Sequence, residues 1–249
     1  MQNQIVPEYL HMAAHYDYLL RHVNYSAWFS YLKKNIEVWC GRRPQRILEI
    51  GTGTGRFGSK FSNFDYEIYG MDISLDMLRA ASMRAFNNYR IFCADVRRVA
   101  TRCKFGFIFA VHDTMNYLLS YDDLEKAFIN ISGMLEDDGI FFFDLTTETN
   151  ILRHFDGVEE SYEHQGTSIV WQNEYDREKK LITSTLHFHD RAGDCVFTEN
   201  HVQRIYTHEE IVPILKTANL ALLARQSDYT FDPPDGETVM ENFIVRKIS

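Results

Sequence analysis

Short apolar segments alternate with segments of helical periodicity through the middle of the chain. The apolar segments, each short enough for a single strand, lie at 46–50, 66–71, 90–94, 106–111 and 139–144. The segments between them predict helices. In one of these, Leu124, Phe128 and Ile131 recur at helical spacing after a capping-box-like start at 120–123. Strands that alternate with helices predict a parallel sheet covered on both faces.

The N-terminal region carries a different pattern. Residues 8–40 are rich in aromatic side chains and are expected to be helical. Five apolar residues recur at spacings of three and four and define one helix face: Tyr25, Trp28, Leu32, Ile36 and Trp39. Two interpretations stay open, a helix that packs on the core and a lid that covers a ligand.

A third pattern follows the fifth predicted strand. Residues 167–175, 181–189 and 195–206 partly alternate between apolar and polar, and turn-like residues separate them. This pattern predicts three antiparallel strands inserted into the alternating core. Such a sheet is expected to form an acceptor pocket or the contact of a homodimer, and the sequence does not decide between the two.

The chain then returns to the core. A helix is expected from residue 207, with Pro213 as a defect within it, followed by strands at 220–223 and 241–245. The predicted organisation is a helical cap (1–43), a Rossmann-like α/β core (44–152 and 207–249) and an inserted antiparallel sheet (153–206). Helices are expected on both faces of the core sheet, which is mostly parallel with an antiparallel last strand.

Composition and charge narrow the functional classes. With 249 residues, 45% of them hydrophobic, the chain can build one large core with a modest insertion. No secretory signal is visible and the apolar runs are too short to span a bilayer, so a cytoplasmic protein without a membrane partner is expected. The net charge of −9 argues against nucleic acid as a partner. His187 and His189 could share a strand face, but without a third ligand nearby no metal is expected.

A glycine-rich loop gives the first functional signal. The strand 46–50 leads directly into Gly51, Gly53 and Gly55. Glycine tolerates positive φ and lets a ligand approach bare backbone. The helix that follows offers unpaired N–H groups. This combination predicts a nucleotide-like cofactor.

The next strand ends in Asp72, about twenty residues after the glycine loop, where an acid can bind ribose hydroxyls. The alternative is that Asp72 or Ser74 only caps the following helix. Glu49, just before the first glycine, suits a ligand's ammonium group better than a diphosphate.

These motifs together resemble the class I S-adenosylmethionine-dependent methyltransferases, in particular the small-molecule methyltransferases of that superfamily. The pattern Glu49-x-Gly51-x-Gly53-x-Gly55 resembles motif I, Asp72 ends the second strand, and Asp95 follows the third, where the superfamily has an acid that contacts adenine. The segment 112–118 resembles the signature after the fourth strand. The segment 53–58 also fits the nicotinamide fingerprint G-x-G-x-x-G, which keeps a dinucleotide cofactor open.

The resemblance implies S-adenosylmethionine as cofactor and a set of residues around it. The expected cofactor residues are Tyr16, Tyr25, Glu49, Gly51, Thr52, Gly53, Gly55, Arg56, Asp72, Ile73, Asp95, Val96 and Val111. His112 is the leading candidate for a catalytic base, because it follows strand four and histidine titrates near neutral pH. A contact to adenine or simple packing is its alternative role. His201 and Tyr206 are weaker candidates.

The expected function is transfer of a methyl group to a nitrogen or oxygen of a small molecule by in-line displacement. Three alternatives stay open: an RNA methyltransferase, an NAD(P)-dependent oxidoreductase, and a regulator that binds the cofactor without turnover. Salt-sensitive RNA binding or binding of NADH would indicate the first or the second.

Overall fold

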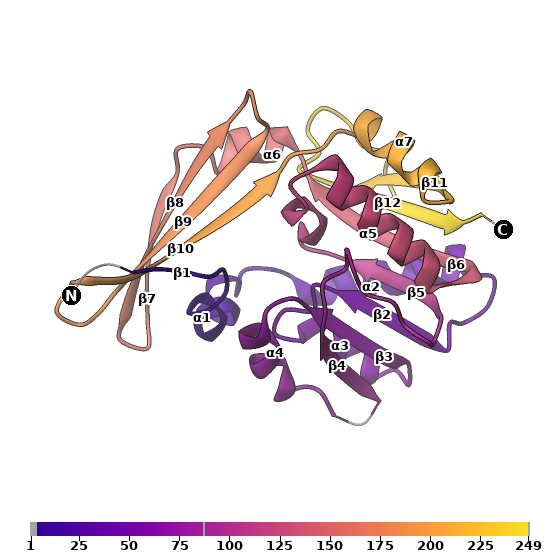
Figure 1. Ribbon diagram of the computed structural model, residues 1–249, viewed down its shortest axis with the longest axis horizontal. Coiled ribbons are helices and arrows are strands. Elements are labelled where there is room, and N and C mark those ends of the chain that lie inside the picture. Colours follow the sequence, from indigo (N-terminus) through magenta and orange to yellow (C-terminus); the bar gives the residue numbers. More distant parts are fainter. Residues whose placement is uncertain (1–3, 87, 249) are drawn as a thin grey trace.

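A seven-stranded sheet forms the core of the computed structural model, which describes residues 4–86 and 88–248. Its strand order is β11-β12-β6-β5-β2-β3-β4 (Figure 1). The strands are β2 (Arg46–Ile50), β3 (Glu67–Asp72), β4 (Tyr89–Cys93), β5 (Phe105–Ala110), β6 (Leu135–Thr146), β11 (Leu220–Ser227) and β12 (Met240–Lys247). Only β12 runs antiparallel to its neighbours. The predicted Rossmann-like sheet with an antiparallel last strand is therefore confirmed.

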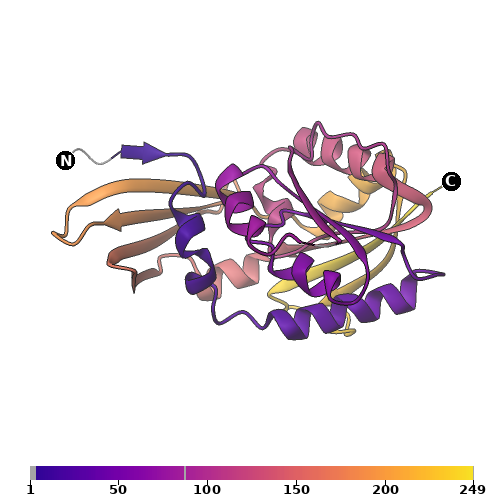
Figure 2. The ribbon, with the colours of Figure 1, turned by 90° about the horizontal axis from the view of Figure 1, so that it is seen from below.

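Helices cover both faces of this sheet, as the near-continuous apolar strands require. On β5, Phe107 and Phe109 face a cluster that includes α2 (Tyr25–Trp39) and α3 (Arg56–Ser62). Ile108 and Ala110 face the opposite cluster, with α5 (Tyr121–Met134) and α7 (His208–Thr217). Figure 2 shows α2 and α5 on opposite sides of the sheet. Burying each of these large side chains contributes about 1.5–3 kcal/mol to folding.

A second sheet extends from one end of the core, with strand order β1-β10-β9-β8-β7 (Figure 1). Its strands are β1 (Gln4–Val6), β7 (Glu159–His164), β8 (Thr167–Asp176), β9 (Leu181–His189) and β10 (Cys195–Arg204). The three predicted antiparallel strands correspond to β8, β9 and β10. The sequence pattern did not predict strands β7 and β1, because β7 is polar on both faces and β1 has only three residues. The short helix α6 (Glu148–His154) joins the core to this sheet.

The N-terminal region is less uniform than the predicted helical cap. It contains β1, then α1 (Met12–Leu19), then α2. The two helices are separate because Asn24 starts α2 anew, accepting the Ala27 N–H at 3.1 Å. Residues 1–3 and 249 of the predicted regions lie outside the described residues. In the described part of the chain, no helix has the length and apolar character needed to cross a membrane.

The Glu199 carboxylate holds the N-terminal segment on the second sheet. It is fully buried on β10 and accepts the backbone N–H groups of Tyr9, His11 and Met12. His201 Nε2 lies 3.2 Å from the same carboxylate. Helix α1 also contacts α4 (Leu75–Ser82) of the core, so this segment connects the sheet to the core.

Replacing Glu199 with alanine is expected to release this segment. Three backbone donors lose a charged acceptor, so we expect a loss of about 3 kcal/mol in the free energy of unfolding. Faster amide hydrogen exchange at residues 9–12 should accompany it. Glu174→Ala, on an exposed position of β8, is the control and should stay within about 0.5 kcal/mol of the wild type. Unchanged exchange at residues 9–12 in Glu199→Ala would contradict this role.

Candidate functional site

The candidate site lies at the carboxyl ends of the core strands. Strand β2 pairs with β3 on one side and with β5 on the other, so the strand order reverses between β2 and β5. Ligands in open α/β sheets bind at such a switch point. A cavity of about 340 Å³ opens there. Nine predicted site residues line it: Tyr16, Gly51, Gly53, Asp72, Ile73, Asp95, Val96, Val111 and His112.

The glycine loop needs its glycines for two reasons. Gly51, Gly53 and Gly55 have φ values of +67°, +54° and +80°, a region that other residues rarely adopt. In addition, a Cβ on Gly51 would lie 2.5 Å from two side-chain atoms of Thr114. A Cβ on Gly53 would meet nothing closer than 3.9 Å. Gly51 thus permits close packing, while Gly53 leaves open space over the loop.

Glu49 braces this loop and does not line the cavity. Its carboxylate is buried and accepts the Thr52 hydroxyl at 2.7 Å, and the backbone N–H of Gly58 is a further donor. The Thr52 hydroxyl also lies 2.5 Å from the Tyr89 hydroxyl. Burial raises the pKa of Glu49 to about 8. The carboxylate that the sequence suggested for a ligand's ammonium group is therefore directed at protein atoms instead.

Asp72 is held in place by two backbone donors. Its carboxylate accepts the N–H of Gly53 at 2.8 Å and that of Ser74 at 2.9 Å. Burial raises the pKa of Asp72. Ser74, not Asp72, caps α4, because its hydroxyl accepts the Met77 N–H at 3.2 Å. Of the two candidates for the helix cap, Ser74 has that role, and Asp72 lines the cavity.

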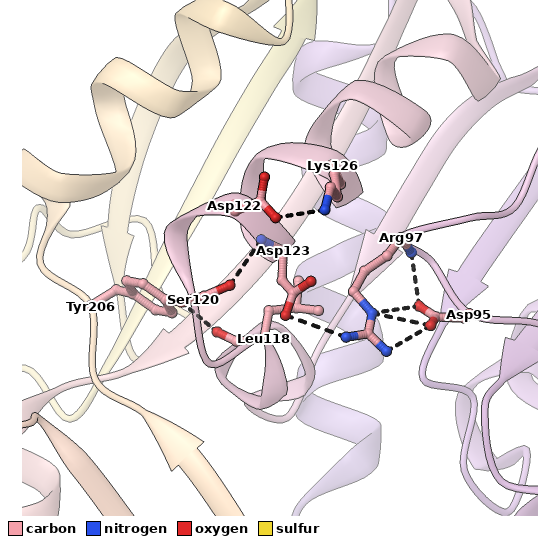
Figure 3. Close-up of polar contacts among 8 residues, drawn as sticks. All are labelled: Asp95, Arg97, Leu118, Ser120, Asp122, Asp123, Lys126 and Tyr206. Atoms are coloured by element: carbon pink, nitrogen blue, oxygen red, sulfur yellow. Dashed lines mark hydrogen bonds and ion pairs between the residues drawn. The ribbon is translucent and has the colours of Figure 1, made fainter.

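Asp95 is paired with Arg97 at the edge of the cavity (Figure 3). The Arg97 backbone N–H, Nε and Nη2 all donate to this carboxylate, at 2.7–3.1 Å. These bonds lower the pKa of Asp95. Arg97 also reaches Asp123 on α5 at 3.3 Å. Asp95 therefore keeps its charge and its orientation beside the cavity.

Two successive residues after β5 adopt left-handed backbone conformations, His112 at φ +63° and Asp113 at φ +53°. Such conformations cost about 1–3 kcal/mol at residues other than glycine. The buried Asp144 carboxylate holds this turn, accepting both backbone N–H groups at 2.7 Å. The hydroxyl of Tyr229 donates to the same carboxylate. The turn brings both side chains to the sheet's switch point.

A second cavity, of about 490 Å³, lies against the first. Four residues line both cavities and form a shared wall: Tyr9, Tyr16, His112 and Tyr117. The remaining lining comes mainly from α6 and the second sheet, including Trp171, Asn173 and Ser184. The inserted sheet thus contributes to an internal cavity next to the first one.

The shared wall is hydrogen-bonded internally. Tyr16 OH lies 3.3 Å from His112 Nδ1, and the Tyr9 hydroxyl donates to that of Tyr117 at 2.5 Å. Burial lowers the pKa of His112, while the negative charge of Asp144 opposes the shift. A neutral imidazole can accept a proton, which is the property a base needs at this position.

The other predicted residues do not line the first cavity. Arg56 places its guanidinium over the Tyr25 ring at 4.0 Å, and this pair links α3 to α2. Tyr206 donates its hydroxyl to the carbonyl of Leu118 and packs in the core (Figure 3). His201 lines the second cavity, with its Nδ1 3.3 Å from Tyr117 OH. Thr52 and Gly55 line neither cavity. Within residues 4–86 and 88–248, no cluster of three or more His, Cys, Asp or Glu side chains is arranged for a metal ion.

Several residues of the site escaped the sequence analysis. Asp113 and Tyr117 lie in the segment 112–118, whose position after the fourth strand was the available signal. Tyr9 gave no signal, because it reaches the site through the Glu199 contact, which is distant in sequence. Asp144 ends a predicted strand, but its partners could not be inferred without the turn at His112.

Comparison with known proteins agrees with this geometry. A family model described as a methyltransferase domain matches residues 47–139. "Putative methyltransferase YqeM" of Bacillus subtilis (strain 168) is 24% identical over 235 residues, covering 92% of this chain and 93% of that protein. An S-adenosylmethionine-dependent methyltransferase from Clostridium acetobutylicum has a TM-score of 0.79 at 24% identity, with 96% and 98% of the chains covered. The sugar N-methyltransferase KedS8 from Streptoalloteichus has a TM-score of 0.80 at 15% identity, with 100% and 98% covered.

Residues 47–139 thus match a methyltransferase domain, and the fold of the chain is that of S-adenosylmethionine-dependent methyltransferases. The family model and the fold together support an S-adenosylmethionine-dependent methyltransferase. The donor set of the first cavity fits S-adenosylmethionine, because three carboxylates (Glu8, Asp72 and Asp95) and open glycine backbone suit a cationic ligand without phosphate. This donor set favours S-adenosylmethionine over the dinucleotide cofactor that the glycine loop left open.

Replacing Gly51 with alanine is expected to weaken both the fold and cofactor binding. The new Cβ must displace Thr114 and adopt a positive φ, which costs about 1–3 kcal/mol from the backbone alone. We expect a lower melting temperature and at least tenfold weaker binding of S-adenosylhomocysteine, measured by calorimetry. Gly41→Ala is the matched control, since no atom lies within 4 Å of its Cβ position. Equal behaviour of the two variants would contradict the packing argument.

Proposed function

We propose that this methyltransferase acts on a nitrogen or oxygen atom of a small-molecule acceptor. The observation that carries the proposal is the pair of adjoining cavities with a shared wall of Tyr9, Tyr16, His112 and Tyr117. Methyl transfer is an in-line displacement, so the acceptor must lie directly against the cofactor's methyl group. Orientation of this kind can lower the barrier by about 7–11 kcal/mol.

We assign the first cavity to the cofactor and the second to the acceptor. Asp72 would accept hydrogen bonds from the ribose, Asp95 would lie near the adenine edge, and the loop at Gly51 and Gly53 would face the methionine part. The methyl group of S-adenosylmethionine is already activated by its sulfonium sulfur. What the protein adds is alignment, exclusion of water and, where the acceptor carries a proton, a base.

His112 is the residue that we assign as this base. Its imidazole lies on the shared wall, within 3.3 Å of Tyr16 OH, and burial favours its neutral form. His201 lies deeper in the second cavity and is already engaged by Glu199 and Tyr117. Tyr206 lines neither cavity, so we give it no part in the reaction.

An acceptor cavity of about 490 Å³ suits a small molecule better than RNA. The net charge of −9 points the same way, because RNA-binding surfaces are basic. The structurally similar KedS8 is a sugar N-methyltransferase, which supports a small polar acceptor. A regulator that only binds the cofactor would not need a second cavity beside the reacting group.

Asp72→Ala is expected to weaken binding of S-adenosylhomocysteine by roughly 10- to 100-fold. A hydrogen bond to a charged group contributes about 1.5–3 kcal/mol, and the ribose would lose this acceptor. Calorimetric titration measures the effect, with NADH as a comparison ligand that should not bind. Asp137→Ala, which removes an exposed carboxylate elsewhere, should bind like the wild type. Unchanged affinity in Asp72→Ala would remove Asp72 from the cofactor site.

His112→Asn tests the base. Asparagine tolerates the left-handed backbone and keeps the N–H bond to Asp144, so the turn should survive. With an acceptor that must lose a proton, we expect formation of S-adenosylhomocysteine to slow by about 10²- to 10⁴-fold. In the wild type, protonation of His112 should lower the rate at acidic pH. This fall in rate should be absent in the variant. An unchanged rate and pH profile in the variant would exclude His112 as the base.

A further inference from the structure

A carboxylate in the acceptor cavity has no cationic partner. Asp113 lines the second cavity and not the first. Its side chain pairs with that of Gln203, a neutral donor. Among the described residues no Lys, Arg or His forms an ion pair with Asp113, whereas Asp95 and Glu199 each have such a partner. A carboxylate removed from water is costly unless an opposite charge meets it.

None of the described residues that line this cavity is a lysine or an arginine. Four histidines line it (His22, His112, His154 and His201), and none of them forms an ion pair with Asp113 in the part of the chain that the structure describes. Its second carboxylate, Glu160, lies at an exposed position and accepts the Tyr162 hydroxyl at 2.6 Å. Asp113 is therefore a partly buried carboxylate of this cavity that has no ion-pair partner among the described residues.

Aromatic side chains line the cavity near this carboxylate. Burial raises the pKa of the Tyr9, Tyr16 and Tyr117 phenols, and the negative charge of Asp113 adds to each shift. Tyr162 and Trp171 line the same cavity. A carboxylate among aromatic faces is a recurrent way of binding an ammonium group, because the rings attract cations as well.

Building on the proposed function, we infer that Asp113 recognises the acceptor and that the acceptor is an amine which binds as its ammonium ion. The carboxylate would hold the ammonium next to the shared wall that carries His112. Gln203 Nε2 donates to the backbone carbonyl of Asp113 at 3.4 Å, and the left-handed turn at His112 fixes the backbone of this residue. An alcohol or a carboxylic acid of the same shape would leave the charge of the carboxylate unmatched, so Asp113 determines specificity.

The same pairing is compatible with the chemistry. The bound ammonium gives one proton to a base, Asp113 or His112, and becomes a neutral amine. The nitrogen lone pair then forms the new N–C bond while the C–S bond breaks, and its electron pair stays on the sulfur. The product is a methylated ammonium ion and a neutral thioether, so charge and atoms balance without a further reactant. Burial, which raises the pKa of Asp113 to about 7, makes its carboxylate able to accept this proton.

The test compares benzylamine with benzyl alcohol, which differ in charge but hardly in shape. Both are titrated into the full-length protein saturated with S-adenosylhomocysteine, and dissociation constants are measured by ligand-observed NMR. The wild type should bind the amine at least about tenfold more tightly than the alcohol. Asp113→Asn, which suits the left-handed backbone, should abolish this preference by weakening the amine alone. Glu160→Gln removes the other carboxylate of the cavity and should keep the preference.

The outcomes separate this inference from the proposed function. Failure of the wild type to bind S-adenosylhomocysteine would overturn the proposed function itself. Binding of S-adenosylhomocysteine without a preference for benzylamine, including no binding of either probe, would overturn only the inference. A preference that persists in Asp113→Asn would also overturn it. Asp113→Asn should bind S-adenosylhomocysteine with the same affinity as the wild type. This result shows that the variant is folded.

Discussion

The buried Asp144 carboxylate is the interaction on which both cavities depend. It accepts the backbone N–H groups of His112 and Asp113 and the hydroxyl of Tyr229. Without this acceptor, two consecutive left-handed residues would be unstable, because each costs about 1–3 kcal/mol. The turn in question is the one that separates the two cavities. A single carboxylate at the end of β6 thus fixes the turn that lines both the first and the second cavity.

The N-terminal region supports the turn at His112. A helix that packs on the core and a lid that covers a ligand are compatible interpretations of this region. Trp28 on α2 stacks on Tyr229 at 3.9 Å between ring centroids, which supports the residue that donates to Asp144. Helix α1 is tied to the glycine loop, because Asp17 accepts the Thr54 hydroxyl at 2.7 Å and pairs with Arg84 at 2.6 Å. Tyr16 on the same helix lines both cavities. Packing contacts thus hold the segment whose Tyr16 lines both cavities.

Local sequence signals were sufficient for the core and insufficient for the walls between the cavities. The strand before Gly51 and the acid at the end of β3 are separated by a short, regular unit, so their meeting at one sheet edge could be predicted. Tyr9 and Asp144 depend on contacts between segments far apart in the chain, and no periodicity announces such contacts. Glu49 shows a third situation. Its position was recognised, but whether a buried carboxylate faces a ligand or a neighbouring hydroxyl depends on rotamer and packing, which the pattern does not encode.

Two carboxylates, Asp113 and Asp144, lie side by side at the switch point, and burial raises the pKa of each to about 7. Their surroundings assign them different tasks. Three donors converge on Asp144, so its charge is satisfied within the protein and serves the backbone. Asp113 has one neutral donor and repels Asp144, so its charge is best satisfied from outside. This difference in surroundings gives Asp144 a structural role in the turn and leaves Asp113 at the second cavity, where the proposed acceptor would meet it.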